Sequence, residues 1–110
     1  MLNMVRMPNV DRLAEQLDIA TSVDPAIDEL IAETFEIPVI GFTSSAMTAR
    51  DLVARILPEA SLRVGFDVCG FLPSATIRNG SGDCTAVAPS VPIAILRAMM
   101  RAMQADDRTD

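Results

Sequence analysis

The sequence predicts a single α+β domain, residues 1–110, in which helices pack on a three-stranded antiparallel β-meander in the order α-α-α-β-β-β-α. Two changes of apolar spacing lead to this fold class. Apolar residues recur at helical spacing in the first half of the chain, change to alternation from Leu62, and return to helical spacing after Pro92. With 110 residues, 50% of them hydrophobic, the chain can build one core.

Two helices are predicted before residue 37. Asn9 is the expected N-cap of the first, which covers residues 10–20. Asp24 followed by Pro25 predicts the start of the second, which covers residues 25–35. Its expected inner side is Ile27, Leu30, Ile31, Thr34 and Phe35, and its expected outer side is Asp28, Glu29, Glu33 and Glu36.

The remaining elements follow from turn residues and period. A cap within residues 43–45 opens a third helix that ends before Pro58. Strands are expected at 62–69, 75–78 and 84–88, with turn residues at 79–82. Ser90 and Pro92 open the last helix, whose inner residues include Met99, Met100 and Met103. Residues 1–8 and 105–110 are expected to fray.

The net charge of −6 is confined to one part of the chain. Residues 11–36 contain eight acids and one arginine, whereas seven acids balance seven arginines from residue 37 onward. A protein with this charge repels nucleic acid and anionic membranes and attracts basic partners. No apolar stretch approaches the roughly 20 residues of a membrane span, so we expect a cytoplasmic protein that binds neither membrane nor nucleic acid directly.

No catalytic constellation is recognisable. Ser44, Ser45, Cys69 and Cys84 are available nucleophiles, but the chain has no histidine or lysine to activate them. Helix caps and buried, reduced thiols account for these four residues. Asp67 and Asp83 could approach each other across the strands, but two carboxylates make a poor metal site. We therefore expect no enzyme activity, no cofactor and no metal.

The acidic helices are the predicted partner-binding surface. A charged outer helix face is usually only solvated surface. Here the segment of residues 11–36 holds a single arginine, and like charges at i, i+4 spacing cost helix stability, which favours selection for something other than folding. The expected partner is a host protein complex with a basic surface. The predicted binding residues are Glu15, Asp18, Asp24, Asp28, Glu29, Glu33 and Glu36.

Several local patterns resemble the phage ABA sandwich domain, a family of small phage proteins without an established molecular function. The resemblance covers about residues 13–103. It rests on LDIATSVD at 17–24, AIDELIA at 26–32, FTSSA at 42–46 with LPE at 57–59, and PIAILRA at 92–98. Two family features are missing: a tryptophan soon after the Pro-Glu step, and a threonine cap that Val91 replaces. The matching positions are caps and core residues, so the resemblance implies a fold and a phage origin rather than an activity.

The expected function is therefore that of a non-enzymatic phage or prophage accessory protein that acts in the host bacterial cytoplasm by protein–protein binding. Its most specific form is an anti-defence inhibitor of the anti-CRISPR type. One alternative is a self-assembling module that forms a homo-oligomer through its less buried sheet face or an edge strand. Another is a small-molecule binder that holds a nucleotide signal through Arg63, Arg78 or Arg97.

Overall fold

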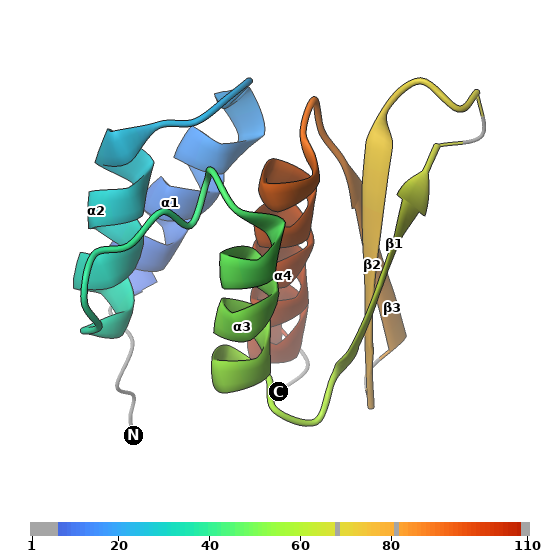
Figure 1. Ribbon diagram of the computed structural model, residues 1–110. Helices are drawn as coiled ribbons and strands as arrows, with labels where there is room; N and C mark the ends of the chain where they lie inside the picture. The colour runs from blue at the N-terminus through green and yellow to red at the C-terminus, as the bar shows by residue number, and fades with distance from the viewer. Residues whose placement is uncertain (1–6, 68, 81, 109–110) are drawn as a thin grey trace.

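In the computed structural model of the chain, the helices and strands follow the predicted order (Figure 1). The structure describes residues 7–67, 69–80 and 82–108. The elements are α1 (Met7–Ile19), α2 (Pro25–Phe35), α3 (Ala46–Ile56), β1 (Ser61–Phe66), β2 (Pro73–Asn79), β3 (Gly82–Val87) and α4 (Val91–Arg108).

The elements form three layers, with α4 in the centre (Figure 1). The sheet lies on one side of α3 and α4, and α1 and α2 lie on the other. A helix with neighbours on opposite sides must be apolar around most of its circumference. The central position of α4 therefore explains its apolar sequence. Its residues that are at most 1% exposed are Ile93, Ala94, Ile95, Leu96, Ala98, Met99, Met100 and Ala102.

Side chains define most helix starts. The Asp24 side chain accepts a hydrogen bond from the Ala26 N–H, and Ser45 accepts one from the Thr48 N–H, so both are N-caps as predicted. Ser90 accepts a hydrogen bond from the Ile93 N–H at the start of α4. Its presence one residue before Val91 supplies the cap that the threonine would provide.

Two helix boundaries differ from the prediction. Because α1 begins at Met7, the prediction that Asn9 is its N-cap is wrong. Pro8 stands in the first turn, where a proline costs no hydrogen bond, so the helix can begin before Asn9. At the other end of the chain, α4 continues to Arg108 through residues expected to fray. Residues 1–6, 109 and 110 lie outside the described residues.

The three strands form an antiparallel sheet in the order β1-β2-β3, with one face covered by helices and one open. On the inner face, Ala75, Ile77 and Ala86 are at most 1% exposed. On the outer face, the Thr76 and Thr85 hydroxyls lie 2.9 Å apart. The sheet therefore alternates apolar and polar residues as the sequence predicted; Val68, within the first expected strand, lies outside the described residues.

Arg97 ties the three layers together from α4. Its Nε donates a hydrogen bond to the Leu17 carbonyl at 2.6 Å, and Nη1 donates to the Val87 carbonyl at 2.7 Å. Nη2 donates to the carbonyls of Asp18 and Ala20 at 2.9 and 3.0 Å. A helix leaves its last carbonyls without partners and carries negative partial charge there, so this guanidinium completes the C-terminus of α1 while holding the end of β3.

We expect Arg97→Met to lower the free energy of unfolding by about 3 kcal/mol, because it removes a charged donor from four carbonyls while keeping the apolar stem. Arg101→Met is the matched control. Arg101 donates one hydrogen bond, to the Thr85 carbonyl, and lies 3.9 Å from the Asp18 carboxylate, so its loss should cost under about 1 kcal/mol. Urea denaturation measures both variants, and equal stabilities would contradict the role given to Arg97.

Candidate protein-binding site

Two of the seven predicted binding residues have structural roles. Asp28 is 7% exposed, and its Oδ1 accepts a hydrogen bond of 2.8 Å from the Thr43 N–H. Asp24 caps α2 with its side chain, and its own N–H donates to Thr43 Oγ1 at 2.9 Å. Both acids therefore hold the connection between α2 and α3 against α2.

The prediction that Asp28 lies on the outer side of α2 is wrong. The physical reason is that the α2–α3 connection folds back over the helix and offers a backbone N–H to the carboxylate. The two residues are 15 positions apart, and helical periodicity contains no information on such a contact. Asp28 was therefore predicted to lie on the solvent side, because charged residues are usually exposed.

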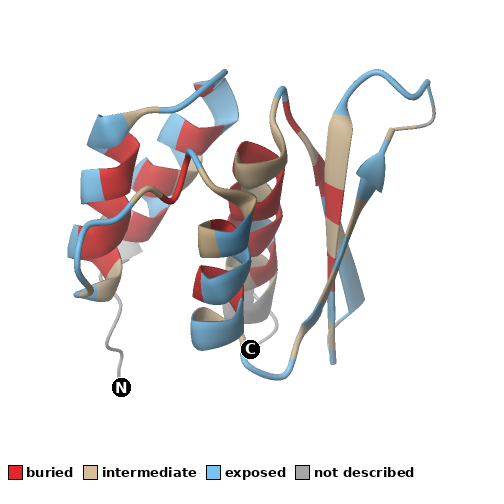
Figure 2. Cartoon of the chain, in the orientation of Figure 1, coloured by how far each residue is buried: buried red, intermediate tan, exposed pale blue. Residues whose placement is uncertain are grey.

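The other five predicted acids are exposed: Glu15 and Asp18 on α1, Glu29 and Glu33 on α2, and Glu36 at the C-cap of α2. We name Glu29, Glu33 and Glu36 the acidic stripe. Every residue of α2 from Ile27 to Thr34 other than Glu29 and Glu33 is buried, so α2 meets solvent along this narrow strip (Figure 2). The spacing of four residues places Glu29 and Glu33 on one helix face as predicted. Glu36, predicted on the same face, instead lies one residue beyond the helix as its left-handed C-cap.

The acidic stripe is not neutralised within the described residues. The ion pairs found there join Arg78 to Asp83 at 2.9 Å and Arg101 to Asp18 at 3.9 Å. Asp18 is thus partly compensated, whereas Glu15 and the stripe are not. Glu29 and Glu33, one turn apart, repel each other, and a basic partner would relieve that repulsion.

An apolar cavity adjoins the end of the stripe. It measures about 180 Å³ and lies between the α2–α3 connection and α3. Val39 and Ile40 in that connection are 57% and 52% exposed, so apolar surface continues outside the cavity. The lining residues are Ile37, Pro38, Ile40, Phe42, Thr48, Asp51, Leu52 and Arg55. The stripe and the cavity together offer negative charge beside an opening for an apolar side chain.

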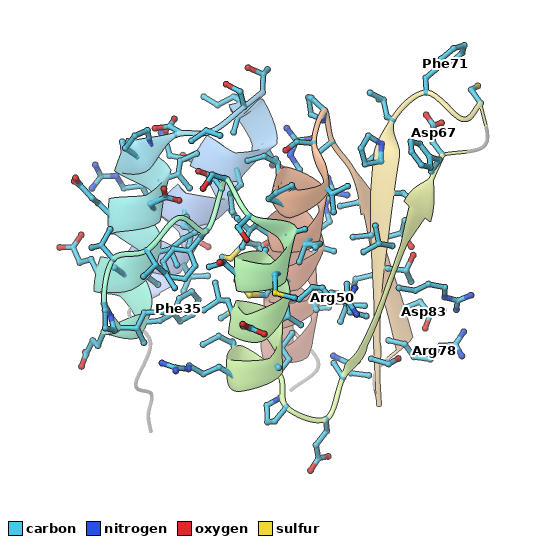
Figure 3. All side chains as sticks on the ribbon, in the orientation of Figure 1. Phe35, Arg50, Asp67, Phe71, Arg78 and Asp83 are labelled. Carbon is cyan, nitrogen blue, oxygen red and sulfur yellow. The ribbon has the colours of Figure 1, made fainter. Side chains whose placement is uncertain are left out.

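The three arginines considered for a nucleotide do not converge. Arg97 is occupied by four carbonyls, and Arg78 makes two hydrogen bonds to Asp83, of 2.9 and 3.2 Å (Figure 3). The Arg78 hydrogen bond, helped by the charges of Arg78 and Arg63, lowers the pKa of the Asp83 carboxyl. Arg63 borders a shallow depression of about 310 Å³ on the outer sheet face. This geometry does not form a phosphate site.

The candidate nucleophiles and carboxylates are also dispersed. Ser45 is a helix cap, and the Ser44 hydroxyl donates to the Gly41 carbonyl. Asp67, which accepts hydrogen bonds from the Phe71 and Leu72 N–H groups, lies at the opposite end of the sheet from Asp83 (Figure 3). Within residues 7–67, 69–80 and 82–108, no three histidine, cysteine or acidic side chains form a cluster suited to a metal.

The predicted burial of the cysteines and methionines can be compared with the structure. Both cysteines are free, but Cys69 is exposed, so the prediction that both thiols are buried is wrong. Cys69 belongs to the loop between β1 and β2, where no layer covers it. Met99 and Met100 are buried in the core as predicted, and Met103 is partly buried and packs against it.

Compared with protein-family models, with curated protein sequences and with solved structures, the chain shows no match. Among the described residues, no helix combines the length and apolar character needed to cross a membrane.

We expect Asp28→Ala to lower the free energy of unfolding by about 2 kcal/mol, because it leaves the Thr43 N–H buried without an acceptor. Asp28→Asn keeps an oxygen at this position and should cost about half as much. Glu29→Ala, one residue along the same helix, should change stability by less than about 0.5 kcal/mol. Thermal denaturation of the three variants distinguishes the structural acid from the exposed one, and a tolerated Asp28→Ala would refute this assignment.

Proposed function

We propose that the protein acts without catalysis, by binding a basic protein surface through the acidic stripe and the apolar cavity beside it. The observation that carries this proposal is the stripe itself: three exposed carboxylates on α2 and at its C-cap, none of which forms an ion pair among the described residues. Evolution usually balances a solvated helix face with both signs of charge, as the rest of this chain does.

The partner's chemistry follows from the two parts of the site. Protein interfaces combine an apolar centre with a polar rim, and the cavity and stripe provide this pair. The matching segment carries an aliphatic side chain for the cavity and arginines or lysines for Glu33 and Glu36. Charge complementarity of this kind raises the association rate and selects against acidic partners.

The setting is the one that the resemblance to phage ABA sandwich domains implies, a phage or prophage accessory protein in a bacterial host. The most specific version is an inhibitor that occupies a basic nucleic-acid channel of a host defence complex, in the manner of anti-CRISPR proteins. An acidic surface competes with phosphates for the same arginines and lysines, so such a partner suits a protein of net charge −6.

The test requires a variant that leaves Asp24 and Asp28 intact, because they hold the fold. Glu29→Gln with Glu33→Gln removes two charges while keeping helix propensity and side-chain shape. We expect this double variant to bind the partner roughly tenfold more weakly, with a smaller dependence of affinity on salt. The partner is captured from host lysate with the tagged protein, purified, and titrated by calorimetry.

Glu59→Arg is the matched control, because it changes the net charge by the same two units at an exposed site after α3. The control should bind like the natural chain. Equal affinities of the natural chain and the double glutamine variant would overturn the proposal, as would equal weakening by the double variant and the control. Loss of capture when nucleic acid is added in excess would support the channel version.

A further inference from the structure

The two edge strands of the sheet, β1 and β3, differ in whether other groups bond their outward backbone N–H and C=O groups. In an antiparallel pair, residues alternate between those bonded to the neighbouring strand and those whose N–H and C=O point away from it. The Asp67 N–H bonds the Leu72 carbonyl, and the Ala88 N–H bonds the Pro73 carbonyl. With the observed register, these two bonds fix which backbone groups point outward along both edge strands.

On β3 the outward residues are Asp83, Thr85 and Val87, and two of their carbonyls are covered. Arg101 Nη1 donates to the Thr85 carbonyl at 3.0 Å, and Arg97 Nη1 donates to the Val87 carbonyl at 2.7 Å. Both arginines come from α4, which lies against this part of the sheet. Two guanidinium groups therefore obstruct the approach of another strand to β3.

On β1 the outward residues are Leu62, Val64 and Phe66. In the part of the chain that the structure describes, no group bonds their outward N–H and C=O groups. The strand contains no proline or bulge, its one charged residue, Arg63, lies on the outer face, and Phe66 is 67% exposed on the inner face. An edge with free backbone groups and apolar side chains is a template for strand addition.

We propose that β1 pairs antiparallel with β1 of a second copy, joining two three-stranded sheets into one of six strands. A two-fold axis perpendicular to the sheet through Val64 makes Val64 face its equivalent and places Leu62 opposite Phe66 of the other copy. All outward backbone groups of the strand then become bonded. The half-covered apolar side chains on the inner face meet one another at the same time.

The outer-face residues of β1 are also compatible with pairing centred on Val64. It places Arg63 of one copy opposite Gly65 of the other, where a side chain added to the glycine would meet no atom within 4 Å. Moving the axis to Arg63 would place two like charges face to face. The sequence of β1 is therefore complementary to itself when reversed about Val64.

The neighbouring helix and the charge distribution permit this contact. α3 borders β1 with Arg50, Asp51 and Ala54, two opposite charges and a small residue that the α3 of a second copy can approach. The excess negative charge lies on α1 and α2, and the α3–α4 layer separates them from the sheet (Figure 1). Repulsion across more than a Debye length of about 8 Å is largely screened at physiological salt.

Val64→Pro tests the edge selectively. Its N–H points outward, so proline removes the two symmetry-related Val64 bonds of the dimer and none within the fold, as for prolines tolerated on edge strands. Val64→Thr, with the same shape and an intact N–H, is the matched control. Sedimentation velocity at about 100 µM should show dimers of the natural chain and of the control, and Val64→Pro should dissociate at least about tenfold more readily.

Amide hydrogen exchange locates the contact. Protection of the Leu62, Val64 and Phe66 amides should rise with protein concentration, while the Arg63 and Gly65 amides, already bonded to β2, should not change. A monomeric natural chain at this concentration, a dimer unaffected by Val64→Pro, or protection that rises elsewhere would overturn the proposal. Glu29→Gln with Glu33→Gln should still dimerise, so failure of the partner-binding proposal remains separate.

Discussion

The contact on which the three layers depend is the set of hydrogen bonds from Arg97 to four carbonyls of α1, its following turn and β3. Arginine suits this position because its planar group presents five donors in fixed directions and stays charged at any pH the protein meets. Three of the bonds join residues 77 to 80 positions apart and fix α1 to α4, and the bond to Val87 fixes the sheet to the same side chain. The last carbonyls of α1 lose contact with water where they lie near an apolar helix, and the hydrogen bonds from Arg97 offset that desolvation cost.

A second long-range contact follows the same logic on the other side of the molecule. The Asp28 carboxylate accepts from Thr43, and Thr43 in turn accepts from Asp24, so two acids fix the path of the α2–α3 connection. That path creates the cavity beside Glu36. Acidic residues in this segment thus have two roles, a structural one where a backbone N–H reaches them and a solvent-facing one along the stripe.

Element types and order were predictable from the sequence because apolar period and caps are local properties: Ser45, Asp24 and the alternation from Leu62 each act within a few residues. The start of α1 was missed because an asparagine, a common N-cap residue, is also tolerated within a helix, and here the helix begins at Met7 with Pro8 in its first turn. The roles of Arg97 and Asp28 were not predictable, since each depends on segments that meet after folding. Of the candidate site, the positions of Glu29 and Glu33 could be predicted from helical spacing, whereas Glu36 at the C-cap and the cavity depend on the path of the connection after α2.

The two proposed surfaces are compatible, and their geometry gives a joint consequence. A two-fold axis perpendicular to the sheet keeps the helices of both copies on the same side of the six strands, so both acidic stripes lie on that side. A partner with repeated basic segments, such as a channel lined by arginines, would then meet two sites on one rigid body. The second contact would form at a high effective concentration, so modest charge interactions at each stripe would combine into tight binding. The arginines that cover β3 make this arrangement finite, because they leave one open edge per copy and so favour a closed pair over a growing sheet.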